Sequence, residues 1–347
     1  MNGKKREPLF AFRALSSAIR SLCSFAALAP PGNLAMCIGP GGAGKTSIAE
    51  RLGEIAFGEE LNWEPGTQPY VNLIANVSDR AYFSPKAFIA SALKALYDPF
   101  RATSQDIATW NISDDAKRIA FSSLSGRSSR SPGERQMRDA FISIAKLKKV
   151  RLLIVDEANL LTLTQLNRVP TDYLESVRLL GDEIGCPIVL LGTTDMLHLL
   201  SYSAQINRRT LHIHLDRIRC EDEEGHEEFI ALLRHLCGLN DALDLKVVLK
   251  LATEIFEWTY GIPGEVVAHL QRAQYCMAGD GCSIVTKTHL EMAKHHPDVQ
   301  QQMIREADLI DRAFNKGISH VSPPEKRPRT KSVRMHPLRR EVGFGTL

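Results

Sequence analysis

The stretch Leu34-Ala-Met-Cys-Ile-Gly-Pro-Gly-Gly-Ala-Gly-Lys-Thr46 decides the fold. It begins with a short apolar run, continues with the pattern G-x-x-x-x-G-K-T from Gly39 to Thr46, and leads into a helical pattern from Lys45 to Ala56. A phosphate-binding loop requires this order of strand, glycine-rich loop and helix. Glycines let backbone N–H groups turn toward phosphate oxygens, and the positive end of the helix dipole adds to the attraction.

The loop therefore predicts a nucleotide site. The Lys45 ammonium would reach the β- and γ-phosphates of ATP, and the Thr46 hydroxyl would ligate Mg²⁺. We expect these residues to contact the nucleotide: Gly39, Pro40, Gly41, Gly42, Ala43, Gly44, Lys45, Thr46 and Ser47.

A second apolar run, Leu152–Val155, ends in two carboxylates, Asp156 and Glu157. About 110 residues after the phosphate loop, this pattern suits a Walker B strand. We expect Asp156 to hold Mg²⁺ through water, and Glu157 to orient or deprotonate the attacking water.

Two further segments carry polar side chains that suit the same chemistry. The apolar run from Ile188 leads into Thr193 and Thr194, and either hydroxyl could sense the γ-phosphate. Arg208 and Arg209 precede an alternating strand, and an arginine at such a place can stabilise the transferred phosphoryl group, often from a neighbouring subunit.

The repeated order of strand and helix predicts an α/β fold, in which helices flank a parallel sheet. Past Asp216 only helical patterns follow, over 223–236, 245–258, 263–276 and 287–295. We therefore expect four parts. They are an N-terminal helical segment (1–29), a nucleotide-binding α/β domain (30–216), a smaller helical lid domain (217–318) and a basic tail (319–347).

Composition excludes several classes of protein. The 347 residues are 44% hydrophobic and 24% charged, which are ordinary globular values, and no apolar run is long enough to span a membrane. Seven scattered cysteines without a C-x-x-C pair indicate neither a zinc knuckle nor a disulfide framework. Arg13 and Arg20 interrupt the apolar part of 1–29, which indicates an amphipathic helix instead of a targeting signal. We expect a soluble cytoplasmic protein.

Positive charge gathers in three places although the net charge is only +3. The helix predicted after the second strand, together with the residues before it, carries Arg80, Lys86 and Lys94. The stretch 117–151 has a net charge of +8, and the tail from Pro323 has +5. Such patches are where an anionic partner would bind, and we expect the first to contact DNA and the tail to bind a protein partner.

The order of phosphate loop, Asp-Glu after a strand, hydroxyl-ended strand, arginine pair and helical domain resembles the AAA+ ATPases. Within that group the chain resembles the TniB/TnsC-type transposition regulators, an initiator-like AAA+ family. The resemblance spans roughly residues 30 to 275 and is carried by 39–52, 69–96, 152–161 and 259–267.

The resemblance implies an ATPase that uses ATP and Mg²⁺. It assigns nucleotide binding and hydrolysis to Lys45, Thr46, Asp156 and Glu157. It assigns γ-phosphate sensing to Thr193 or Thr194, and the role of a trans-acting arginine finger to Arg208 or Arg209. One segment departs from the family pattern, since Glu265 and Val266 follow the turn after which many members carry a second sensor arginine. The nearest basic residue is Arg272, and we expect this segment only to start a lid helix.

Three functions are compatible with these patterns. By the resemblance, the chain is a regulator of DNA transposition that forms a ring or filament on duplex DNA, without sequence specificity, and recruits a transposase together with target-selection proteins. ATP hydrolysis would then reset the assembly. The alternatives are a remodelling or loading ATPase, helicase-loader-like or secretion-associated, that acts on protein, and a nucleotide-gated switch with negligible turnover.

Overall fold

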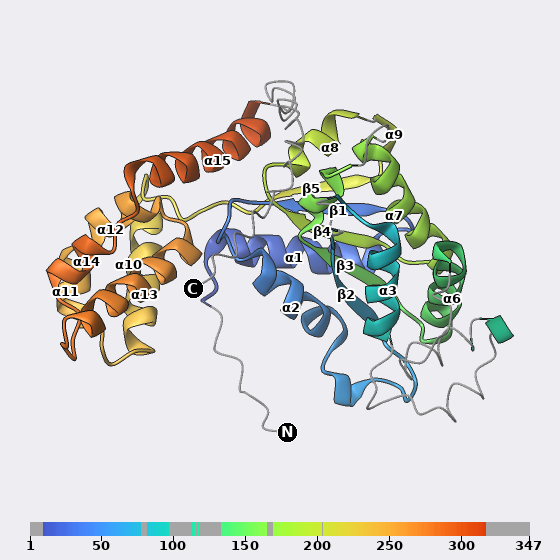
Figure 1. The fold of residues 1–347 in the computed structure, drawn as a ribbon, viewed down its shortest axis with the longest axis horizontal. Coiled ribbons are helices and arrows are strands. Elements are labelled where there is room, and N and C mark those ends of the chain that lie inside the picture. Colours follow the sequence, from blue (N-terminus) through green and yellow to red (C-terminus); the bar gives the residue numbers. More distant parts are fainter. Residues whose placement is uncertain are drawn as a thin grey trace, which may run out of the picture.

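The computed structural model describes residues 10–77, 82–96, 113–115, 117, 133–164, 169–202 and 204–316. Its centre is a parallel sheet in the order β2-β3-β4-β1-β5 (Figure 1). The strands are β1 Leu34–Ile38, β2 Tyr70–Ile74, β3 Leu152–Asp156, β4 Ile188–Gly192 and β5 Thr210–His214. The predicted parallel α/β fold is thus confirmed.

Helices cover both faces of this sheet, so the three central strands are buried at every position. On one face lie α1 Arg13–Leu28 and α2 Lys45–Phe57, and on the other α3 Pro85–Leu96, α6 Glu134–Leu147 and α7 Pro170–Ile184. Alternate residues of β1 enter opposite cores, with Met36 in one and Cys37 in the other.

Short elements make the remaining connections of the α/β part. The helices α8 Met196–Tyr202 and α9 Ala204–Asn207 lie between β4 and β5. Two 3₁₀ turns follow α2 and β3, namely η1 Glu60–Asn62 and η2 Ala158–Thr162. The second strand is shorter than its apolar pattern, which extends to Val77, because Val77 pairs with Phe83 in an isolated antiparallel bridge.

A group of helices follows β5. Its members are α10 Glu223–Gly238, α11 Leu245–Lys250, α12 Ala252–Thr259, α13 Pro263–Gly279, α14 Lys287–Met292 and α15 Pro297–Lys316. The pattern over 245–258 predicted one helix, but the backbone breaks at Leu251 and two helices form. No described helix has the length and apolar character needed to cross a membrane.

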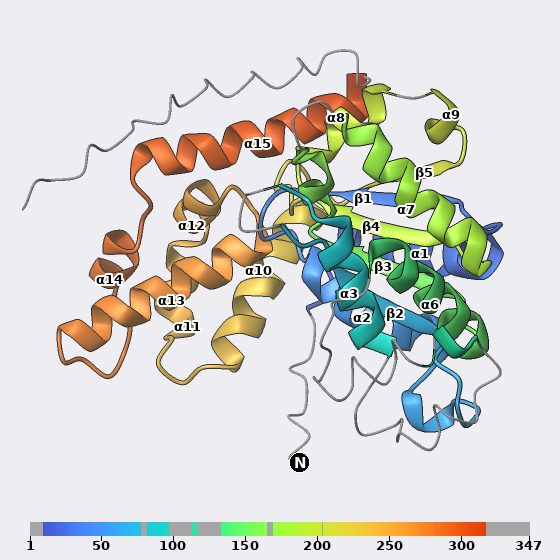
Figure 2. The same ribbon diagram turned by 45° about the vertical axis from the view of Figure 1, so that its right-hand side comes forward.

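The last helix, α15, was not predicted, and it returns to the α/β part. Figure 2 shows it running from α14 toward α8. Ala307, Ile310 and Ala313 are buried, and the latter two belong to the core on the α3 side of the sheet. Spaced three residues apart, they form one stripe of the helix. This helix therefore joins the two parts of the molecule.

Candidate nucleotide site

The phosphate loop connects β1 to α2, as its sequence predicted. Gly42 and Gly44 adopt left-handed backbone conformations, with φ of 78° and 99°, which residues with a Cβ rarely reach. Thr46 is exposed in the first turn of α2, where a helix leaves its N–H groups unpaired. The loop thus has the backbone geometry that phosphate binding requires.

Lys45 is buried, and its ammonium donates hydrogen bonds to the carbonyl oxygens of Gly39 (2.9 Å) and Pro40 (2.6 Å). Burial lowers the pKa of Lys45, and the negative charges of nearby groups, Glu157 and Asp156 among them, oppose that shift. A buried cation held by neutral carbonyls is suited to an anionic ligand, because a phosphate replaces those bonds with stronger ones.

The two carboxylates follow β3 directly. Asp156 is buried, and its Oδ1 accepts a hydrogen bond of 2.9 Å from the Glu157 N–H. Glu157 is exposed and has φ of 53°, a left-handed conformation that is uncommon for a residue with a side chain. Such strain is found where the surrounding fold fixes a side chain in one direction.

Strand order brings the carboxylates to the phosphate loop. β4 lies between β3 and β1, and all three are parallel, so their carboxyl ends share one edge of the sheet. Gly39 N–H donates to the Gly192 carbonyl at 3.3 Å, which joins the loop to the end of β4. Thr193 and Thr194 follow there and are both half-buried. The structure places both threonines at this edge and does not favour one as the sensor.

Arg208 and Arg209 lie at the other end of the sheet. The Leu34 N–H, at the start of β1, donates to the Arg209 carbonyl at 2.9 Å. Lys45 follows the far end of β1, and five residues of strand span about 17 Å. Both arginines are exposed, and they line a groove of about 680 Å³ together with Arg20. They do not reach the phosphate loop of their own chain.

A cavity of about 320 Å³ beside the phosphate loop was not predicted. Gly42 and Gly44 line it from the loop, Phe10 from the N-terminal segment and His235 from α10. The Phe10 and His235 rings have centroids 5.6 Å apart. The sequence signal was two aromatic residues ahead of the first helix, Phe10 and Phe12, and neither indicates a distant partner on α10. Volume, position and aromatic lining suit the base of a nucleotide.

The turn at Gly261–Gly264 ties the helical part to the phosphate loop. Gly264 N–H donates to the Gly42 carbonyl at 2.8 Å, and α13 begins beside it, as expected for a segment that starts a lid helix. Arg272 donates to the Ala293 carbonyl at 2.9 Å and lies 3.9 Å from Glu265, so its described contacts are within the helical part. This arrangement gives no support to Arg272 as a second sensor.

The basic candidates are described only in part. Lys86 and Lys94 are exposed on α3, and a spacing of eight residues puts them on one face of the helix. Arg80 and the tail from Pro323 lie outside the described residues. Of the stretch 117–151, only 117 and 133–151 are described.

Comparison with known proteins supports the fold. Residues 31–200 match the family model described as an AAA domain. The Walker-type ATPase paby2304 of Pyrococcus abyssi is 16% identical, with 92% of this chain and 87% of that chain covered and a TM-score of 0.55. The ORC2 protein of Aeropyrum pernix, in its ADP form, is 13% identical, with 83% and 70% covered and a TM-score of 0.50. Curated protein sequences gave no match.

Residues 31–200 thus resemble an AAA domain, and the chain has the P-loop AAA+ fold with a helical C-terminal region. The fold class was predicted correctly. The finer resemblance to transposition regulators stays a prediction.

Proposed function

We propose that this chain is an ATPase that assembles on duplex DNA and regulates transposition by recruiting a transposase. The observation that best supports ATPase activity is that the phosphate loop and the two carboxylates lie at the same edge of the sheet. A buried lysine, a buried aspartate and a strained glutamate follow parallel strands that flank β4. ADP in the structural neighbour from Aeropyrum pernix supports the same class of ligand for this fold.

The residues fit ATP and Mg²⁺. The glycine-rich loop offers backbone N–H groups, Lys45 offers its ammonium, and the base cavity lies beside Gly42. Thr46 and Asp156 would supply oxygen ligands to Mg²⁺, which prefers such ligands. When bound, Mg²⁺ neutralises charge on the phosphates. Glu157, one residue after Asp156, then accepts the proton of the attacking water.

The proposed arginine finger would come from a second copy of the chain. Arg208 and Arg209 lie about 17 Å from their own phosphate loop. If Arg208 or Arg209 stabilises the transferred phosphoryl group, it therefore acts on a neighbouring copy, and such an arginine raises turnover by about 10³- to 10⁵-fold. This supports a homo-oligomer with ATP between its subunits.

Lys86 and Lys94 are the described cations proposed to contact DNA. Both are exposed on the ordered helix α3, which the core fixes through Phe88 and Leu93. Lysines bind phosphates as point charges and carry no sequence information, so the binding should not depend on base sequence. The tail from Pro323 is proposed to bind the transposase, and target-selection proteins are proposed to bind the same assembly.

The test is ATP turnover with and without duplex DNA. Stimulation by DNA together with ATP-dependent DNA binding supports this function. Stimulation by a protein partner alone supports a loading or remodelling ATPase, and binding without turnover supports a switch. Glu157→Gln should bind ATP and assemble on DNA but lose turnover, whereas Lys45→Ala should also lose nucleotide affinity. Turnover near the wild-type rate in Glu157→Gln contradicts the assigned role of Glu157.

Mixing two variants tests the shared site. Arg208→Ala or Arg209→Ala should bind ATP normally and hydrolyse it slowly. Adding Glu157→Gln should restore activity, because some interfaces then pair an intact Glu157 with an intact arginine. Failure to restore activity at every mixing ratio contradicts an arginine supplied in trans.

A further inference from the structure

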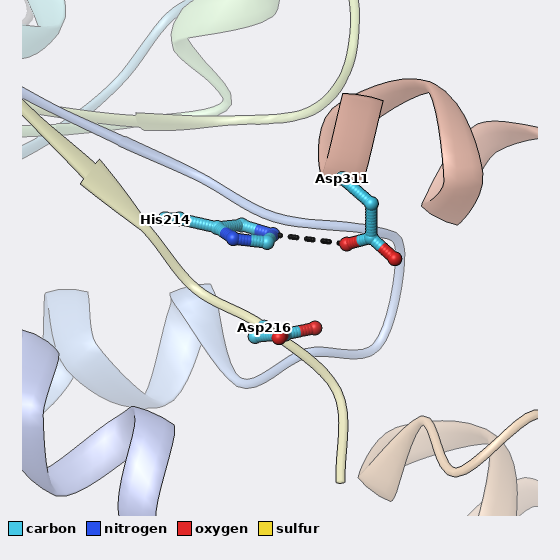
Figure 3. A group of neighbouring side chains, drawn as sticks. All are labelled: His214, Asp216 and Asp311. Carbon is cyan, nitrogen blue, oxygen red and sulfur yellow. Dashed lines mark ion pairs between the residues drawn. The ribbon is translucent and has the colours of Figure 1, made fainter. Parts of the chain in front are cut away.

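Arg217 is a buried arginine that the proposed mechanism does not use. It follows the end of β5 by three residues and is 8% exposed. The carboxylate of the preceding Asp216 lies with His214 and Asp311 (Figure 3) and accepts hydrogen bonds of 2.7 and 3.2 Å from Arg219. Within the described part of the chain, no carboxylate pairs with the Arg217 guanidinium. A buried charge without a counter-ion is costly, so another contact must hold it there.

The guanidinium of Arg217 lies on the ring of Tyr260. Its Cζ is 3.7 Å from the ring centroid, and its Nη1 donates to the Tyr260 carbonyl at 3.4 Å. An aromatic face attracts a cation, most strongly where water is excluded. Nε of Arg217 is buried and has no hydrogen-bond partner among the described residues. Tyr260 is therefore the residue that holds this charge.

Tyr260 occupies a position that favours glycine. It ends α12 with φ of 54°, the left-handed conformation in which many helices end and which glycine adopts most easily. A residue with a Cβ is strained there, so a tyrosine at this place indicates that its side chain is needed. The Tyr260 hydroxyl donates to Asp308 Oδ1 of α15 at 2.6 Å. The ring is thus held on its face by Arg217 and at its hydroxyl by α15.

The turn that follows Tyr260 forms part of the nucleotide site. The Gly264 N–H donates to the Gly42 carbonyl of the phosphate loop at 2.8 Å. Pro263 and Gly264 line the base cavity, together with Val267 of α13. The direction in which this turn leaves α12 depends on the backbone conformation of Tyr260. A change in that conformation therefore moves one wall of the cavity.

We propose that Arg217 is a positioning residue, which holds Tyr260 and thereby fixes the wall of the base cavity. The proposal rests on the nucleotide site proposed above and adds a residue outside that site which sets its affinity for the nucleoside. Without Arg217, the backbone of Tyr260 leaves its strained conformation, Pro263 and Gly264 shift, and the base loses part of its contact. The phosphate contacts remain, because β1 and α2 hold the phosphate loop from both sides.

Calorimetric titration of the full chain with Mg²⁺ and three ligands tests this role. In Arg217→Met, the dissociation constants of ATP and ADP should both rise about tenfold, the loss expected for a cation–π contact shielded from water. The dissociation constant of tripolyphosphate, which lacks the nucleoside, should stay within twofold. The KM for ATP should rise while kcat is unchanged. Methionine also removes an uncompensated buried charge, so the midpoint of denaturant unfolding should stay the same or rise.

Three more variants separate the ring from the charge. Arg217→Lys keeps a cation over the ring and should lose less affinity for ATP than Arg217→Met. Tyr260→Asn tolerates the left-handed backbone but removes the ring, so it should weaken ATP binding at least as much. Adding Arg217→Met to Tyr260→Asn should cause no further loss, because both break the same contact. Arg138→Met is the matched control, since Arg138 on α6 donates to the Ser176 carbonyl at 3.3 Å, and it should bind ATP as the wild type does.

The outcomes distinguish this role from the others. Equal losses for ATP and tripolyphosphate overturn the positioning role, since Arg217 then acts on the phosphates or on the whole fold. Wild-type affinity for ATP in Arg217→Met or in Tyr260→Asn overturns it as well and leaves the nucleotide site intact. If the wild type does not bind ATP, the nucleotide site and the positioning role are both wrong.

Discussion

Replacing Gly264 by alanine should separate α13 from the phosphate loop. A Cβ at this position would lie 2.6 Å from the carbonyl oxygen and 2.7 Å from the Cα of Gly42. Both are backbone atoms, so no rotamer change can relieve the contact. The 2.8 Å hydrogen bond from Gly264 N–H to the same carbonyl is lost if the two segments move apart.

The size of the effect follows from these contacts. A separation of about 0.7 Å is needed to reach ordinary van der Waals distance. Overpacking of this kind costs about 1–3 kcal/mol, and loss of the hydrogen bond costs about 1 kcal/mol more. The base cavity is lined by both segments, so opening the contact removes part of its wall. At about 1.4 kcal/mol per factor of ten, the affinity for ATP should fall at least 30-fold.

Calorimetric titration with ATP measures this change, and Gly279→Ala is the control. Gly279 lies on the same helix, and a Cβ there would meet no atom within 4 Å. Alanine is the better helix former, so this variant should be neutral or slightly stabilised. If Gly264→Ala binds ATP within twofold of Gly279→Ala, the contact with Gly42 does not shape the nucleotide site.

Three further outcomes are expected. Changing Lys86 and Lys94 to glutamine should lower the log–log salt dependence of DNA binding by about one unit for each lost phosphate contact, whereas Lys250→Gln, exposed on α11, should not. Deleting 323–347 should leave ATP-dependent assembly on DNA intact and abolish transposase recruitment in a pull-down; loss of DNA binding would contradict this division. Burial, aided by nearby positive charge, lowers the pKa of His269 from 6.5 to about 4. The unfolded chain binds this proton more tightly, so the free energy of unfolding should fall by up to about 3 kcal/mol between pH 6.5 and 4. Denaturant titration should show a smaller fall in His269→Gln.

The sequence was informative where chemistry and local structure coincide. The glycines of the phosphate loop, the apolar strands and the Asp-Glu pair each depend on neighbours within a few residues, and all lie where their patterns predicted. The parallel sheet followed from the alternation of strand and helix. The order of the strands in the sheet could not be predicted in this way. β1 pairs with β4, about 154 residues away, and local sequence patterns do not indicate which distant strands pair.

The parts that were missed depend on long-range contacts. α15 has its buried stripe at Ala307, Ile310 and Ala313, but polar residues dominate its sequence, and Arg219, which forms an ion pair with its Asp311, lies about 90 residues earlier. The base cavity needs Phe10 to approach α10, which no spacing indicates. The choice between the two threonines after β4 is a matter of side-chain direction toward a ligand, and sequence position alone cannot decide it.

The parallel strands give the sheet two unlike ends, with Lys45 at one and Arg209 at the other. If Arg208 or Arg209 acts on a neighbouring copy, as proposed, the copies are joined head to tail by a heterologous contact. In an open row, one terminal copy always holds a phosphate loop that no arginine reaches, whereas a closed circle has no such copy. Activity per copy should therefore rise with the length of a row and approach a limit, but be constant for a circle. Rate measurements over a series of DNA lengths can thus reveal the closure of the assembly without imaging.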